Sequence, residues 1–282
     1  MSRLIYLLTF ICFLTACGPS EDQKAMKYLD AARLSLQEGK YSIAKLQIDS
    51  IKSQYPKAFD TRKAGIQLML TVEKEEQLKG LQFIDSVLAS RIESLEEILK
   101  KNQFKLDKNE EYQELGTYYT NTQTIEKNNT RAYLRFTTDE RGKMVMTSYY
   151  YGSFPIKHNV VKIATNSSTF AETMPADNLY ESKHLGMVTE RQDFILGKED
   201  GDVIDFIVNN ASTPLYVTYL GEKTYKYRLS QVDIDAAVQI ASLSRVLESI
   251  QELKVLKADA NKKLKFIDSR IEAYNNQESQ VK

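Results

Sequence analysis

The sequence predicts an α+β protein in which long helices flank one strand-rich insertion. In residues 24–113 and again in residues 230–275, apolar side chains recur every three or four positions, which is the spacing of one helix face. Between residues 114 and 229 this periodicity disappears, and Tyr, Thr and Val become frequent in short segments separated by turn residues. The insertion is therefore expected to be an antiparallel β-domain.

Residues 1–16 have the pattern of a signal peptide. Arg3 precedes an apolar run, Leu4 to Phe13, that is far shorter than the ~20 residues of a membrane-spanning helix. The next residues, Leu14-Thr15-Ala16-Cys17, resemble the lipobox of bacterial lipoproteins. The resemblance implies that the Cys17 thiol is diacylglycerated, that the chain is cut before it, and that Cys17 anchors the protein to a membrane. The alternative is an ordinary signal peptide followed by a coincidental cysteine.

Residues 17–23 are small, polar and acidic, as expected of a lipidated tether. Glu21 and Asp22 resemble the acidic export signal of Bacteroidetes-type surface lipoproteins. By the sorting rule of enteric lipoproteins, Gly18 argues against retention in the inner membrane. The expected location is the cell envelope, at the outer membrane, on either its periplasmic face or the cell surface.

The charge balance excludes some partners. The chain has 38 basic and 38 acidic residues, and loss of the signal removes Arg3 and no acid, which leaves a formal net charge of −1. Such a balance does not favour nucleic acid or a general attraction to an anionic membrane. With Cys12 removed and Cys17 acylated, no thiol remains for disulfides, redox chemistry or zinc, and no cofactor is predicted.

The first helical segment suggests a hairpin. Gly39, Tyr41, Ala44, Ile48, Ile51 and Pro56 stand at the spacings of the second half of a tetratricopeptide repeat, and Ala32 fits the small position of its first helix. The segment resembles one such repeat. One copy cannot bury a continuous core, so it is expected to pack on a following long helix that starts near Ala58 and runs to about Gln113, with a break at residues 102–109.

Two apolar seams predict a pair of long helices. They are formed by Leu81, Ile84, Leu88, Arg91, Leu95 and Ile98 and by Leu243, Val246, Ile250, Leu253, Lys257, Ala260, Leu264, Ile267, Ile271 and Tyr274. The second helix begins at a capping box, Ser230 with Asp233, and residues 276–282 are a tail. We expect an antiparallel coiled coil within one chain; pairing between chains is the alternative.

Short strands are predicted throughout residues 114–229. Segments 131–138 and 143–151 flank Gly142 as a hairpin, segments 215–220 and 223–229 flank Gly221, and residues 203–208 (VIDFIV) are a further strand. Further strands are expected at 118–123, 156–164 and 187–196. About seven to nine strands at this spacing predict a sandwich or a barrel; we favour a β-sandwich, and expect it to fold independently.

No catalytic signature is present in the sequence. His158 and His184 lack a partner at a fixed spacing, and the acidic run 199–202 suits a solvated hairpin turn better than a calcium loop. Tyrosine is concentrated in the insertion. Because strand residues alternate between faces, Tyr149 and Tyr151 share one face, and Tyr225 and Tyr227 share another. These four tyrosines are the candidate ligand or partner surface, and ordinary strand propensity is the alternative explanation.

The predicted function is a non-enzymatic envelope lipoprotein. Its coiled-coil stalk would present a β-rich module that binds an envelope protein or a glycan, and the lipid on Cys17 would hold it to the membrane. Two alternatives stay open: a carbohydrate-binding surface lipoprotein, suggested by the tyrosines, and a hydrolase with an unrecognised site, suggested by the two histidines and the acidic turn.

Overall fold

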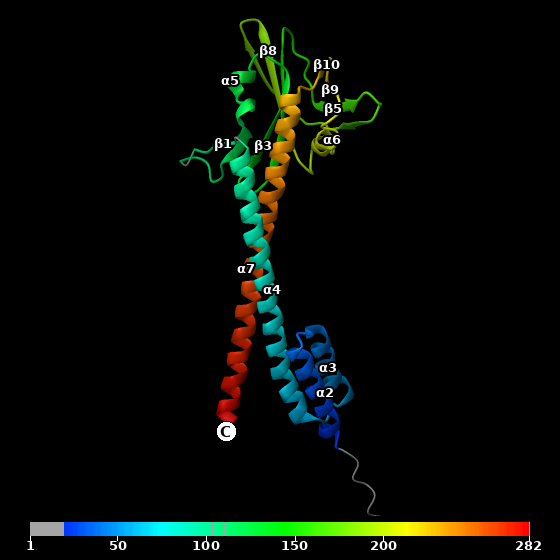
Figure 1. Ribbon diagram of the computed structural model, residues 1–282, viewed down its shortest axis with the longest axis vertical. Coiled ribbons are helices and arrows are strands. Elements are labelled where there is room, and N and C mark those ends of the chain that lie inside the picture. Colours follow the sequence, from blue (N-terminus) through cyan, green and yellow to red (C-terminus); the bar gives the residue numbers. More distant parts are fainter. Residues whose placement is uncertain (1–19, 103, 110, 282) are drawn as a thin grey trace, which may run out of the picture. The chain divides into compact units, whose positions relative to one another are not determined.

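A computed structural model describes residues 20–102, 104–109 and 111–281. The chain is an α+β protein with two antiparallel sheets, so the predicted fold class is confirmed (Figure 1). It divides into two compact units. The first, called the helical unit below, comprises the chain up to Asp85 together with the segment from Leu256 on; the sheet unit comprises Ser86–Val255. No helix in the described ranges is both long and apolar enough to span a bilayer.

The helical unit begins with two helices joined by a tight turn. Helix α2 (Glu21–Gln37) and helix α3 (Tyr41–Gln54) are connected through Gly39, whose φ of +69° suits glycine. Ala32 and Ala44 are fully buried where these helices meet α4. As the sequence predicts, small side chains line this contact and let the helix backbones approach.

Helix α2 starts inside the expected tether. Ser20 is its N-cap: the Ser20 hydroxyl accepts from the Gln23 amide at 3.2 Å, and the Gln23 side chain accepts from the Ser20 amide at 3.1 Å. This reciprocal capping box satisfies two amides that a helix end would otherwise leave without partners. The expectation of a flexible tether extending to Gln23 is therefore wrong for its last residues. Cys17, the expected lipidation site, and residues 1–16 lie outside the described residues.

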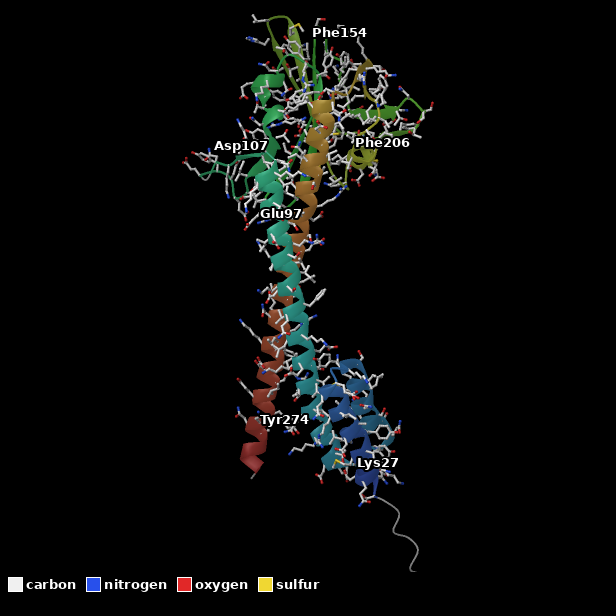
Figure 2. All side chains as sticks on the ribbon, in the orientation of Figure 1. Lys27, Glu97, Asp107, Phe154, Phe206 and Tyr274 are labelled. Carbon is white, nitrogen blue, oxygen red and sulfur yellow. The ribbon has the colours of Figure 1, made fainter. Side chains whose placement is uncertain are left out.

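Within the helical unit, the first part of α4 (Phe59–Lys101) and the last part of α7 (Gln231–Val281) run antiparallel in the same chain. Lys257 pairs with Asp85 at 2.6 Å, and Lys74 pairs with Asp268 at 2.8 Å. The Tyr274 hydroxyl donates to a main-chain carbonyl of α4 at 3.3 Å; Figure 2 labels this side chain. The predicted seam is visible here, since Ala260 and Ile267 are buried while their outward neighbours are exposed.

The sheet unit contains a six-stranded and a four-stranded sheet. The larger has the order β1-β2-β3-β4-β8-β7 and the smaller β10-β9-β5-β6, with every neighbouring pair antiparallel. The strand bounds are β1 (Phe104–Asp107), β2 (Thr117–Thr120), β3 (Tyr133–Asp139), β4 (Met144–Gly152), β5 (Val160–Thr165), β6 (Phe170–Glu172), β7 (Tyr180–His184), β8 (Met187–Ile195), β9 (Leu215–Leu220) and β10 (Tyr225–Arg228). Short helical turns η2 (Asn121–Gln123) and α5 (Ile125–Asn128) connect β2 to β3.

Most predicted strands are present, but one is wrong. Residues 203–208 belong to helix α6 (Val203–Asn209), because Val203, Ile204 and Ile207 are buried at helical spacing. A six-residue run that is apolar except for Asp205 does not distinguish a buried strand from a buried helix turn. The acidic run before it is a turn that leads from β8 into α6, with Asp202 as the N-cap, and not a hairpin turn between two strands. Strands β1, β6 and β7 were not predicted; β1 lies before the expected domain boundary at 114, and all three are short and mostly exposed.

The core of the sheet unit includes α7. Side chains of both sheets and of α6 pack with Ile234, Ala237 and Ile240 from the first turns of that helix. The β3–β4 hairpin also rests on α7: Ser244 donates its hydroxyl to the Gly142 carbonyl at 2.6 Å, and a Cβ on Gly142 would stand only 2.4 Å from the Glu248 nitrogen. A domain limited to residues 114–229 would therefore lack the α7 side chains that complete its hydrophobic core.

Candidate functional site

One face of the six-stranded sheet points away from the core and carries tyrosines and arginines. Core residues such as Leu134, Phe136 and Met146 define the inner face, so their strand neighbours lie on the outer one. We call this outer surface the tyrosine–arginine face. Its members are Tyr119, Tyr133, Arg135, Tyr149, Tyr151, Tyr180 and Arg191.

The side chains of this face stack in a row across the strands. Tyr133 and Tyr149, directly opposite on β3 and β4, are parallel with ring centroids 4.7 Å apart. Arg191 is opposite Tyr149 on the next strand, and its guanidinium lies 5.3 Å from the ring centre of Tyr180. Such cation–π and stacked pairs are attractive, but they leave the polar groups of the side chains free to bind other molecules.

A second stacked pair and two unsatisfied polar atoms lie on the same face. The Arg135 guanidinium lies 4.9 Å from the ring centre of Tyr119. The Tyr133 hydroxyl and Arg135 Nε are buried, and neither has a hydrogen-bond partner within the described chain. Burial raises the pKa of Tyr133 above its ordinary value, so its hydroxyl stays protonated. A buried polar group without a partner costs free energy, and both atoms are inaccessible to a ligand in this conformation.

The structure separates the four candidate tyrosines. Tyr149 and Tyr151 lie half-buried on the tyrosine–arginine face, as alternation predicts. Tyr225 and Tyr227 instead pack against the core around Tyr219, and the hydroxyls of Tyr219 and Tyr227 are 2.9 Å apart. Burial raises the pKa of both hydroxyls. Of the two candidate pairs, Tyr225 and Tyr227 therefore pack on the core and do not form an exposed platform.

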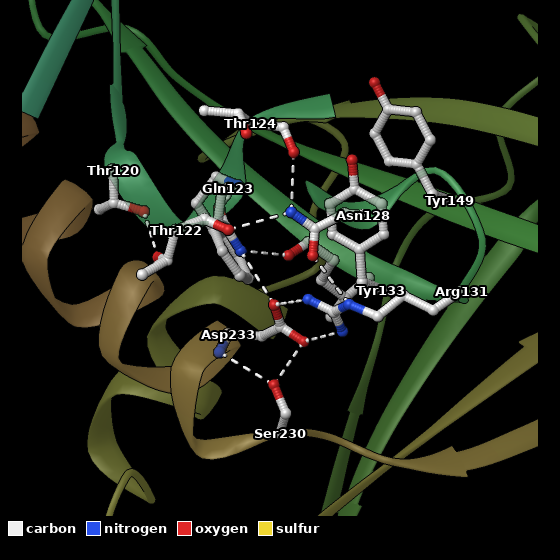
Figure 3. Close-up of polar contacts among 12 residues, drawn as sticks. Thr120, Thr122, Gln123, Thr124, Asn128, Arg131, Tyr133, Tyr149, Ser230 and Asp233 are labelled. Carbon is white, nitrogen blue, oxygen red and sulfur yellow. Dashed lines mark hydrogen bonds and ion pairs between the residues drawn. The ribbon is translucent and has the colours of Figure 1, made fainter. Parts of the chain in front are cut away.

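One buried carboxylate joins the edge of this face to α7. Asp233 is fully buried and accepts from both terminal nitrogens of Arg131 at 2.7 Å (Figure 3). The Ser230 hydroxyl donates to the same carboxylate at 2.7 Å, and Gln123 donates to it at 3.3 Å. The Arg131 guanidinium also lies 4.8 Å from the ring centre of Tyr133. The predicted capping residues Ser230 and Asp233 thus hold an arginine of the outer face in place.

A serine, a histidine and a glutamate meet in the core. Ser148 Oγ is 2.7 Å from His158 Nε2, and His158 Nδ1 is 2.8 Å from Glu190 Oε2. With Nδ1–H donating to the carboxylate, Nε2 accepts the Ser148 proton, which is the order of groups in serine hydrolases. Sequence reasoning missed this cluster because the three residues come from different strands and loops without a fixed spacing.

The cluster is sealed from solvent. All three side chains are fully buried, and the His158 ring stacks on Tyr219 at 4.6 Å. Glu190 also accepts the backbone amides of Ile156, Lys157 and His158 at 2.6, 2.8 and 3.2 Å. Burial alone would raise the pKa of Glu190, but the hydrogen bonds from His158 and these amides outweigh it, and the pKa lies below its ordinary value. These hydrogen bonds hold the turn at residues 156–158 against β8.

The other candidate residues do not form a site. His184 is exposed at the end of β7. Asp200 is buried and accepts the amides of Gly197 and Ile204 at 2.7 and 3.4 Å, so it helps to start α6. In the described part of the chain, no three His, Cys, Asp or Glu side chains gather as metal ligands.

Asp233→Asn should destabilise the sheet unit by about 2–3 kcal/mol, because it leaves Arg131 facing an amide while Arg131 stays partly solvated. The matched control is Asp235→Asn, an exposed carboxylate on the same helical turn, which should change stability by less than about 0.5 kcal/mol. Urea unfolding of both variants checks this. Equal effects would contradict the assigned role of Asp233.

Glu190 should make stability depend on pH. Its folded pKa is lower than the unfolded value of about 4.3, so the unfolded chain binds the proton more tightly. The stabilisation is complete above that value and is lost as pH falls through the folded pKa. Glu190→Gln should therefore lower the unfolding free energy by about 2–4 kcal/mol at pH 7, and the gap from wild type should narrow towards pH 3. A pH-independent gap, or the same behaviour in the exposed Glu252→Gln, would refute this assignment.

Comparison with known proteins does not assign a function to the residues described above. No family model, curated protein or solved structure matches the chain. We therefore base the proposed function on the residues and contacts described above.

Proposed function

We propose that the protein is a non-enzymatic cell-envelope lipoprotein whose sheet unit binds an envelope protein or a glycan. The lipid on Cys17 would anchor it at the outer membrane, on the periplasmic face or the cell surface. The helices would serve as a coiled-coil stalk with a tetratricopeptide-like hairpin, and the two sheets as a sandwich-like binding module. The lipobox Leu14 to Cys17 supports the anchor. The buried alanines Ala32 and Ala44 between the helices and the ion pairs between α4 and α7 in the helical unit suit a stalk.

The observation that carries the binding proposal is the tyrosine–arginine face. Two of its polar atoms, the Tyr133 hydroxyl and Arg135 Nε, have no partner within the described chain but are buried, so the exposed side chains of Tyr180 and Arg191 are the ones that a ligand can reach. Arg191 forms no ion pair with any described carboxylate, so its guanidinium is available to a ligand. Tyr180, 56% exposed, offers an apolar ring with a polar tip at the edge of the row. Tyrosine and arginine are the side chains that dominate binding energy at protein interfaces.

A hydrolase is the second candidate, because Ser148, His158 and Glu190 have the order of a catalytic triad. Their complete burial disfavours it, since no substrate reaches Ser148 Oγ in this conformation. Labelling with a fluorophosphonate probe, which reacts with activated serines, distinguishes a hydrolase from a non-enzymatic binding protein. We expect no labelling of the native protein; labelling that disappears in Ser148→Ala would favour the hydrolase.

Cys17→Ser should move the protein from the membrane fraction to the soluble fraction and abolish its labelling by fatty acid, because one or more acyl chains provide the anchor. Fractionation and metabolic labelling with palmitate measure both effects. Ser20→Ala, which changes only the helix cap nearby, is the control and should leave labelling intact. Persistent labelling of Cys17→Ser would remove the lipoprotein assignment.

The double variant Tyr180→Ala/Arg191→Ala should weaken binding of the unlipidated protein to purified envelopes at least about tenfold, because truncating a central aromatic or arginine commonly costs more than 1.4 kcal/mol. Both side chains are exposed, so folding should be unaffected. The control is Tyr216→Ala/Lys226→Ala, a cation–π pair with a 5.4 Å separation on the other sheet. Equal loss in both variants would place the binding surface elsewhere.

A further inference from the structure

The helical unit contains an apolar pocket of about 230 Å³ between α3 and the first turns of α4. Its floor is formed by Ile48, Ile51, Gly65, Ile66, Met69 and Leu70. Gly65 has no side chain, and a Cβ there would stand 3.5 Å from Ile48 Cγ2, so the absence of this methyl group deepens the floor. The pocket is shaped for an apolar group such as part of an acyl chain.

The rim of the pocket is predominantly basic. Lys52, Arg62 and Arg270 line it together with one acid, Asp49. Lys52 and Arg62 form no ion pair within the described residues, and Arg270 meets Glu73 only at 3.9 Å. Arg62 donates one hydrogen bond, at 2.7 Å, to the Pro56 carbonyl and keeps its other donors. The chain as a whole is almost neutral, but this rim suits an anionic group.

The pocket lies at the end of the helical unit where the chain enters. Glu21 and Asp22, in the first turn of α2, contact the end of the α3–α4 loop and the first turn of α4: the Lys57 amide donates to Glu21 at 3.2 Å, and the Thr61 hydroxyl donates to Asp22 at 3.0 Å. Thr61 directly precedes the pocket residue Arg62. Three residue steps separate Cys17 from Ser20, and an extended chain of that length spans about 10 Å. If Cys17 is acylated as proposed, this end of the unit is held against the bilayer.

The first turns of α4 next to the pocket present an apolar surface. Phe59 is 72% exposed and Ile66 is 51% exposed, and their separation of seven residues places them on one face of the helix. Arg62 lies between them on that face. Exposed apolar side chains interleaved with a cation are typical of helices that lie in a membrane interface.

We propose that this pocket and the adjoining Phe59–Ile66 surface bind an anionic lipid of the bilayer. Its headgroup would contact Lys52, Arg62 and Arg270, and part of an acyl chain would cover the apolar floor. Glu21 and Asp22, the acids at this end, accept hydrogen bonds from the Lys57 amide just before α4 and from the Thr61 amide in its first turn. The nearness of the bilayer rests on the proposed Cys17 anchor, whereas recognition of the lipid depends only on the pocket.

The test uses the chain from residue 17 onwards with Cys17→Ser, so that the acyl anchor does not contribute. Co-sedimentation is measured with vesicles of phosphatidylglycerol and phosphatidylcholine in equal parts and with vesicles of phosphatidylcholine alone. We expect binding to the first and at least about tenfold weaker binding to the second. Lys52→Gln should weaken binding to the anionic vesicles about fivefold, and Phe59→Ala should weaken it comparably.

Matched controls are Lys254→Gln and Phe83→Ala, which remove an exposed cation of α7 and a 70% exposed aromatic side chain of α4 away from the pocket. Both should bind like the parent chain. Equal affinity for the two vesicle types, no binding to either, or equal losses in the pocket and control variants would overturn the proposal. Binding of free dodecanoate without binding of vesicles would overturn it too. These measurements do not involve Cys17. A negative result would therefore refute the lipid pocket without bearing on the lipoprotein anchor, which palmitate labelling tests separately.

Discussion

The ion pair between Arg131 and Asp233 is the interaction on which the sheet unit depends. Asp233 is fully buried, and the two 2.7 Å hydrogen bonds from Arg131 compensate for its desolvation. The pair joins the start of β3 to the first turn of α7 across 102 residues of sequence. The pair fixes the position of the first turn of α7 against the sheets. It therefore determines which side chains of α7, including Ile234 and Ile240, complete the hydrophobic core.

Buried carboxylates with several donors recur in this unit. Glu190 holds a turn with three backbone amides and His158, and Asp200 holds the start of α6 with two amides. Glu190 thereby joins β8 to the distant turn at residues 156–158, whereas Asp200 orders the local turn that leads into α6. The triad-like order at Ser148 is explained by the same need, since His158 requires a partner on both ring nitrogens when it is fully buried. Structural demands are therefore sufficient to account for this geometry.

The sequence predicts elements whose signal is local. The apolar spacing of α4 and α7 and the glycine of the β3–β4 hairpin identified those elements correctly. The start of α2 also has a local signal, since Ser20 and Gln23 fit the same capping motif as Ser230 and Asp233. The small, polar and acidic composition of residues 17–23 instead predicts a tether, and this composition does not distinguish a tether from the first turn of a helix. The sequence does not predict helix α6, because five apolar residues within six positions fit both the two-residue period of a strand and the 3.6-residue period of a helix.

The candidate site was only partly predictable. Alternation placed Tyr149 and Tyr151 on one face, but no rule of spacing shows which face of a strand meets the core, and Tyr225 and Tyr227 proved to face it. Arg191 and Tyr180 join Tyr149 only through the register of β4, β8 and β7. The pairing of Asp233 with Arg131 and of Ser148 with His158 likewise depends on tertiary contacts that a single sequence does not encode locally.

The central claim is that α7 is part of the sheet unit's core and not merely a stalk that leaves it. Chemical denaturation of two fragments, residues 114–229 and residues 86–255, tests this most directly. We expect the longer fragment to unfold in one cooperative transition, and the shorter one, which lacks Asp233 and the buried side chains of α7, to show none. A cooperative transition of residues 114–229 with the midpoint of the longer fragment would contradict the account.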